Sequence, residues 1–355
     1  MSKMLNSASP VPVAVTRQLV AAAEKFFRLA PWRFMSDLHL VGLRDEVTGE
    51  LRVASVMGAL GEVFGVGCYR GAAGLGWLHA MATSDEASTD STAFLEGLDC
   101  LKVEWTKKQE LSKPDLDLLA NAGFKPPGRG SVWPKFQSAA PGWYPWFVNE
   151  TEARQLRDDL GKLARLAELF AQEPDLFDDC EPGEIAVVPA GERPLRREEI
   201  NWTPLLPPPS TMSPPAALSA DEEQKLAALP MREDFVFEFT AQLVPELAFM
   251  DAKAGRPCIP RAALMSDRRS YFIFASELCS AAAPLGEAAA KSLVKGLLTA
   301  KVRPGAIHAD TPALVAVLTP ACATLGVRVE FRAELKAAHD AIENMASHFG
   351  GRHGR

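Results

Sequence analysis

Apolar residues recur at helical spacing in two stretches of the first half of the chain. Residues 16–30 carry an apolar stripe interrupted by charged positions, which predicts an amphipathic helix that ends at Pro31. Residues 149–171 carry a longer stripe, and either Asn149 or Thr151 provides a side-chain cap at its start. The apolar positions of this second stripe are Leu156, Leu160, Leu163, Leu166 and Phe170.

Shorter apolar runs between these two helices have the character of strands. Strands are predicted over 38–43 and 51–57, on either side of the polar turn Asp45–Gly49, whose glycine permits positive φ. Residues 59–69 and 74–81 are apolar and rich in glycine, and we interpret both as helices that pack closely on neighbouring backbone. The further elements predicted are a strand over 98–105 and a short helix over 113–121. This mixture predicts an α+β N-terminal domain.

The second half of the chain has a different order, with three strands before its first long helix. Phe235, Phe237 and Phe239 alternate with other side chains, which is typical of a strand. The predicted strands are 234–244, 259–265, 271–277, 306–308 and 327–331, and the predicted helices are 286–300, 312–325 and 333–349. The order β-β-β-α-β-α-β-α predicts an α/β domain with one mixed sheet, antiparallel at first and then parallel through right-handed crossovers. This order is similar to that of the ribonuclease-H-like fold, which retroviral-type integrases and transposases share.

A proline-rich stretch, Thr203–Pro215, separates the two halves. It contains six prolines, and no charged residue occurs between Asn201 and Ala220. Proline fixes φ and lacks the backbone donor, so this stretch predicts a semi-rigid polyproline spacer rather than a helix or a central strand. We therefore expect an acidic, tryptophan-rich domain over 1–200, a linker over 201–218, an α/β domain over 219–349 and a flexible tail over 350–355.

The composition is that of a folded protein. Of 355 residues, 47% are hydrophobic and 23% are charged, which argues against disorder over most of the chain. The net charge is −7 and arises before the linker, so a surface coated in positive charge for nucleic acid or membrane is not expected. There is no apolar run long enough to span a bilayer and no recognisable signal peptide, so we expect a cytoplasmic protein without a membrane partner. The six cysteines are too widely spaced for zinc-binding pairs.

The segment 124–147, here called the aromatic-basic segment, combines aromatic and basic side chains with many prolines and glycines. Rings stack on flat ligands and cations attract phosphates, so one interpretation is a contact surface for a protein partner or an anionic ligand. The other interpretation is that the rings pin a long irregular loop to its own domain. The candidate binding residues are Lys125, Arg129, Trp133, Lys135, Trp143, Tyr144 and Trp146.

The resemblance to the ribonuclease-H-like order also implies where metal-binding carboxylates would lie. Enzymes with that fold place carboxylates on the first strand, near the end of the fourth strand and on the last helix, where they hold two Mg²⁺ ions. At these places the chain has Glu238, Asp310 and, on the last helix, Asp340 and Glu343. Against this interpretation, exposed acidic residues are common on any helix, and the neutral charge of this half indicates no basic groove for nucleic acid.

Several short motifs resemble those of an uncharacterised bacterial family. They are PWRFM at 31–35, VMGALGEVF at 56–64, GRGSVWPKF at 128–136 and PGWYPWF at 141–147. Members of that family join two domains of unknown function, so the resemblance implies the domain split and no chemistry. Because no strong catalytic motif is present, we expect a non-catalytic binding protein that uses the aromatic-basic segment and needs no cofactor. The alternative is a metal-dependent nuclease or related phosphoryl-transfer enzyme that would use the four carboxylates with Mg²⁺.

Overall fold

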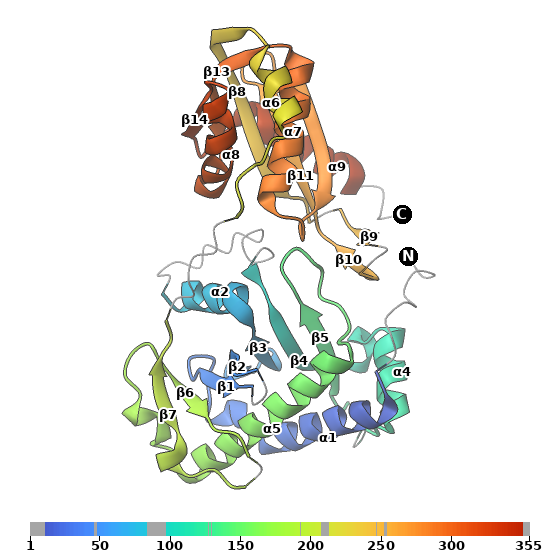
Figure 1. The fold of residues 1–355 in the computed structure, drawn as a ribbon. Coiled ribbons are helices and arrows are strands. Elements are labelled where there is room, and N and C mark those ends of the chain that lie inside the picture. The colour runs from blue at the N-terminus through green and yellow to red at the C-terminus, as the bar shows by residue number, and fades with distance from the viewer. Residues whose placement is uncertain are drawn as a thin grey trace. The chain divides into compact units, whose positions relative to one another are not determined.

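The computed structural model describes residues 11–45, 48–83, 97–126, 128, 130–191, 193–206, 213–245, 247–251 and 254–350. The chain divides into two compact units, residues 1–209 and 210–355. Each unit contains a sheet with helices packed on it (Figure 1). Within the described ranges, no helix is both long enough and apolar enough to cross a bilayer.

The first unit is built on a seven-stranded mixed sheet with the order β5-β4-β3-β2-β1-β6-β7. All neighbouring strands are antiparallel except β1 and β6, which are parallel. The strands are β1 (Val41–Arg44), β2 (Leu51–Met57), β3 (Phe64–Tyr69), β4 (Cys100–Thr106), β5 (Trp133–Ala139), β6 (Glu184–Val188) and β7 (Asn201–Pro204).

Two long helices, α1 (Val13–Leu29) and α5 (Glu150–Gln172), pack together and bury one face of this sheet. The shorter helix α4 (Lys113–Ala122) packs beside α1. Both long helices occur where the apolar stripes predict them. Of the two caps predicted for α5, Asn149 and Thr151, the structure has Asn149, whose side chain accepts a hydrogen bond from the N–H of Glu152 at 3.0 Å.

Two glycine-rich or proline-rich stretches were predicted incorrectly. The helix expected over 59–69 is wrong, because residues 64–69 form β3. Gly65 suits a strand here, since a Cβ at this position would lie 3.0 Å from the carbonyl oxygen of Val103 on β4. The aromatic-basic segment is not one irregular loop, because residues 133–139 form β5 at the edge of the sheet. Strands β6 and β7 were not predicted.

The second unit is built on a five-stranded mixed sheet with the order β12-β11-β8-β13-β14. The strands of this sheet that come first along the chain, β8, β11 and β12, are antiparallel neighbours, whereas β13 is parallel to both β8 and β14. The mixed sheet predicted from the order of elements is therefore confirmed. The strands are β8 (Met231–Leu243), β11 (Pro260–Asp267), β12 (Ile273–Ser280), β13 (Arg303–Ala309) and β14 (Arg328–Phe331), with a separate pair β9 (Phe249–Asp251) and β10 (Arg256–Cys258).

Helices cover both faces of this second sheet. On one face, α6 (Ala220–Ala227), α7 (Leu285–Ala300) and α8 (Pro312–Thr324) enclose a core that includes Phe237 and Phe239 of β8. On the other face lies α9 (Lys336–Gly350), which packs on β8 and β11.

The proline-rich stretch between the units is shorter than the linker expected over 201–218. Residues 201–204 form β7 and pair with β6, so they belong to the first sheet. Ala216 is buried in the second unit, and its N–H donates to the carbonyl oxygen of Val317 at 2.9 Å. Residues 201–204 therefore belong to the first unit, and Ala216 belongs to the second.

Candidate functional site

The second face of the first sheet, opposite α1 and α5, carries a small apolar cluster under helix α2 (Gly71–Thr83). Leu78 of α2 is buried there together with Val53, Ile185 and Val187 of the sheet. Among the described helices, α2 is the one that packs on this face, and it contacts β2 and β3. A single short helix cannot cover seven strands, and a hollow lies beside it.

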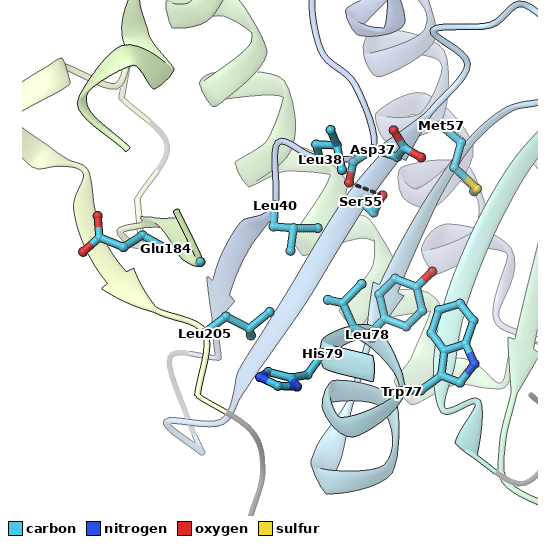
Figure 2. A pocket seen from close by; sticks show the side chains of 12 residues that line it. Asp37, Leu38, Leu40, Ser55, Met57, Trp77, Leu78, His79, Glu184 and Leu205 are labelled. Atoms are coloured by element: carbon cyan, nitrogen blue, oxygen red, sulfur yellow. Dashed lines mark hydrogen bonds between the residues drawn. The ribbon is translucent and has the colours of Figure 1, made fainter. Parts of the chain in front are cut away.

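This hollow is a cavity of about 590 Å³ (Figure 2). Its lining comes from the segment that precedes β1, from β2, β3 and α2, and from residues that flank β6 and β7. Six of the twelve lining residues have apolar side chains: Leu38, Leu40, Met57, Trp77, Leu78 and Leu205. A concave and mostly apolar cavity of this size is typical of a site for a small molecule.

Tyr69 and Trp77 form the aromatic part of the lining. Their ring centroids are 5.3 Å apart and their planes are 19° from parallel. Gly67 makes room for Tyr69, since a Cβ at Gly67 would lie 3.4 Å from the Tyr69 hydroxyl oxygen. Burial raises the pKa of Tyr69, so its hydroxyl is neutral at ordinary pH. This hydroxyl has no hydrogen-bond partner within the described part of the chain, which leaves it available to a ligand.

A few polar groups converge on the same cavity. Ser55 donates its hydroxyl to the carbonyl oxygen of Asp37 at 3.1 Å, and Figure 2 shows this bond beside Leu38. Glu184 also lines the cavity, and its carboxylate accepts the N–H of Glu181 at 3.2 Å. Among the described residues, no three His, Cys, Asp or Glu side chains are placed to hold a metal ion. The arrangement suits the binding of an apolar molecule that carries one or two polar groups.

None of these cavity residues was identified from the sequence, although strand β2 contains one indirect signal. Leu51, Val53 and Met57 point to the face of the cavity, whereas Ala54 and Val56 are buried against α1 and α5. A strand with apolar residues on both faces is expected to be covered on both sides. The pattern thus predicts that both faces of β2 are packed, but it does not predict that α2 covers only part of the second face.

In the aromatic-basic segment, the first predicted binding residues have different environments. Lys125 is exposed, and Arg129 lies outside the described residues. Trp133 is half-buried, with its ring centroid 5.2 Å from that of Phe124. Lys135 is half-buried on β5, where it is paired in register with Glu104 of β4.

The remaining residues of this segment, Trp143, Tyr144 and Trp146, follow β5 and are half-buried. Trp146 exchanges two backbone hydrogen bonds with Ser138 of β5, at 2.8 and 2.9 Å, so the chain folds back on the edge strand. The indole nitrogen of Trp146 is buried and has no hydrogen-bond partner among the described residues. The segment is therefore held to its own sheet, and its four aromatic residues Trp133, Trp143, Tyr144 and Trp146 are only half-buried.

The four predicted carboxylates divide into a buried pair and an exposed pair. Glu238 is 3% exposed, and its Oε2 accepts the N–H groups of Ala337 and Ala338 at 2.8 and 3.1 Å. These groups belong to the first turn of α9, where the helix dipole also favours a carboxylate. Asp340 and Glu343 lie further along α9 and are exposed.

Asp310 follows β13 and lies under the same helix. Its Oδ2 accepts hydrogen bonds from Thr240 Oγ1 at 2.5 Å and Gln242 Nε2 at 2.8 Å, and lies 3.2 Å from His339 Nε2. Its Oδ1 is buried with no partner within the described ranges. Glu238 and Asp310 thus both lie on the face of the sheet that α9 covers, and protein donors already occupy one oxygen of each.

Comparison with known families matches both halves of the chain. Residues 17–187 match a domain of unknown function (DUF7309), and residues 222–346 match a second domain of unknown function (DUF6930). No curated protein and no solved structure matches the chain. The two-domain organisation expected from the motifs is therefore confirmed.

Proposed function

We propose that this chain, which joins the two domains of unknown function DUF7309 and DUF6930, is a non-catalytic binding protein. Its ligand is a small, largely apolar molecule, held in the cavity between α2 and the sheet of the first unit. The observation that carries this proposal is the cavity of about 590 Å³ beside α2, on the face of the first sheet that this helix covers only in part. The neutral Tyr69 hydroxyl would orient the ligand by donating a hydrogen bond to it.

The proposal is tested by titrating the protein with the apolar fluorescent probe 8-anilinonaphthalene-1-sulfonate. Leu205→Trp adds a large side chain to the cavity lining, and it is expected to weaken binding of the probe by about tenfold or more. The matched control is Leu60→Trp, because Leu60 is 92% exposed in the same unit and outside the cavity. Non-saturable binding of the probe, or equal affinities for the two variants, would contradict the proposal.

The aromatic-basic segment remains a second predicted contact surface of such a binding protein. Its support is that Trp133, Trp143, Tyr144 and Trp146 are only half-buried and that Lys125 of the same segment is exposed. Substituting Lys125 by Glu should weaken capture of an anionic partner, whereas the same change at the exposed Lys113 should not.

For the second unit, we propose a ribonuclease-H-like topology that serves as a binding platform rather than a nuclease. The strand order β12-β11-β8-β13-β14 supports this topology. Against the nuclease alternative, Glu238 caps α9 and Asp310 is bound by three side chains. Mg²⁺-dependent cleavage of DNA or RNA that is lost in Asp310→Asn would favour the nuclease instead.

A further inference from the structure

A second cavity, independent of the proposed function, lies on the opposite face of the first sheet, beside α5. Its volume is about 610 Å³. Its charged lining comprises two carboxylates, Asp45 and Asp158, and five cations: Lys25, Arg52, Arg157, Lys162 and Arg165. Five cations around one cavity raise the question of what balances their charge.

Three of these cations have carboxylate partners. Lys25 pairs with Glu168 at 2.9 Å, Arg52 with Asp159 at 2.7 Å, and Arg157 with the adjacent Asp158 at 2.6 Å. The charge of each of these side chains is therefore compensated within the unit.

The other two cations, Lys162 and Arg165, are buried and form no ion pair with a carboxylate of the described residues. They are 7% and 6% exposed. Lys162 Nζ donates to the carbonyl oxygen of Arg44 at 2.7 Å. Arg165 donates from Nε and Nη1 to the carbonyl oxygens of Arg193, Pro189 and Gly191 at 2.8, 3.0 and 2.7 Å. Within the described part of the chain neither cation forms an ion pair. Lys162 does attract the buried Asp159, since its charge lowers the pKa of that carboxyl against the effect of burial. Arg165 is held by carbonyl oxygens alone among the described residues.

The donors of these two cations are not exhausted by the carbonyl groups. An ammonium has three donors and a guanidinium has five. Arg165 Nη2 has no acceptor among the described residues, and the ammonium of Lys162 has one. Both side chains line the cavity, so the unused donors are available to an anion that enters it.

A glycine in the middle of α5 points to the same conclusion. Glycine is unfavourable inside a helix, and here packing does not require it, because a Cβ at Gly161 would have no heavy atom within 4 Å. Gly161 lines the cavity next to Lys162. Gly161 is exposed, so a larger side chain there would extend into open space at the cavity without a clash.

We propose that this cavity binds a small phosphate-bearing organic anion. The ammonium of Lys162 attracts its phosphate oxygens as a compact positive charge. The Nη2 group of the planar Arg165 guanidinium donates hydrogen bonds to them. The volume is larger than one phosphate group needs, so the remainder accommodates the organic part of the molecule.

The proposal is tested by isothermal titration of the whole protein with inorganic pyrophosphate, and with citrate as a carboxylate comparison. The wild-type protein should bind pyrophosphate at one site and more tightly than citrate. Gly161→Glu places a carboxylate in the cavity and should weaken pyrophosphate binding by at least about tenfold. The matched control, Arg154→Gln, removes a cation from the same helix outside the cavity and should leave the affinity unchanged.

A second variant separates blocking of the cavity from loss of the fold. Gly161→Leu fills the same space without a charge, and it should also weaken pyrophosphate binding while the thermal midpoint of the protein is retained. The proposal is overturned if pyrophosphate does not bind, if citrate binds more tightly, or if both Gly161 variants bind like the wild-type protein.

Discussion

Arg52 and Asp159 form the most deeply buried ion pair of the first unit. Arg52 donates from Nε and Nη2 to the two carboxylate oxygens of Asp159 at 3.0 and 2.7 Å, and the two side chains are 1% and 0% exposed. Removing one partner of such a pair leaves a buried charge without compensation. Asp159→Asn leaves Arg52 with only its second and partly exposed partner, Asp45 at 3.2 Å, and should lower the free energy of unfolding by about 3 kcal/mol.

The neighbouring residue provides the control for this substitution. Asp158 is 51% exposed and pairs with Arg157 at the surface, so Asp158→Asn should change stability by less than about 1 kcal/mol. All seven tryptophans lie in the first unit, so their fluorescence during urea unfolding reports its stability. Equal losses in the two variants would mean that the buried pair is not stabilising the unit.

His39 makes the first unit sensitive to mild acid. Its Nδ1 accepts the N–H of Ser36 at 3.0 Å, and its ring lies 4.6 Å from that of Phe177. Burial lowers the pKa of His39, although Asp37 opposes this, so the folded state prefers the neutral ring. Below about pH 6.5 the unfolded chain binds the proton first, and stability falls as the pH approaches the lowered value.

The expected result is a loss of stability between pH 7.5 and 5.5 that is smaller in His39→Gln than in the wild-type protein. Tryptophan fluorescence during urea unfolding at both values measures it for the first unit. If His39→Gln keeps the full dependence, another group is responsible for it.

At the scale of single elements, the start of α5 depends on a reciprocal cap. The Asn149 side chain accepts the N–H of Glu152, and the Glu152 carboxylate accepts the N–H of Asn149, both at 3.0 Å. Asn149→Ala should lower the free energy of unfolding by about 1 kcal/mol. Asn121→Ala, at an exposed position in the last turn of α4, should lie within about 0.5 kcal/mol of the wild-type protein.

The sequence predicts best those elements whose apolar residues recur at a regular helical or strand spacing. The leucines of α5 and the alternating phenylalanines of β8 each bury one side, so their spacing alone identifies the element. β3 was predicted as a helix because apolar residues with four nearby glycines show no clear period. β5 was hidden because Pro134 and the surrounding glycines indicate a loop, although an edge strand tolerates a proline.

At the scale of the whole molecule, the two cavities could not be predicted from the sequence. The apolar cavity exists because α2 covers only part of a sheet face, which depends on the length of one helix relative to the sheet. The charged cavity depends on Arg165 reaching three carbonyl groups that lie 24 to 28 residues away in the chain. Of the four predicted carboxylates, Glu238 and Asp310 lie on the face of the second sheet that α9 covers, whereas Asp340 and Glu343 are exposed on α9.

The boundary between the units can be tested with fragments of the second unit. Residues 213–218 precede the Ser219 cap of α6, yet Ala216 is 4% exposed and Leu218 packs on the core. Gly286 faces this segment so closely that a Cβ there would lie 2.2 Å from the carbonyl oxygen of Pro214. The segment is therefore expected to stabilise the second unit rather than to act as a free spacer.

A fragment that begins at Ser219 should be less stable than one that begins at Ser213, by about 2 kcal/mol. This figure combines one lost hydrogen bond, from Ala216 to Val317, with the exposure of the apolar surface of Ala216 and Leu218. Urea unfolding followed by far-ultraviolet circular dichroism measures both fragments. Equal midpoints would assign residues 213–218 to the spacer, and failure of the longer fragment to unfold cooperatively would show that the second unit needs the first.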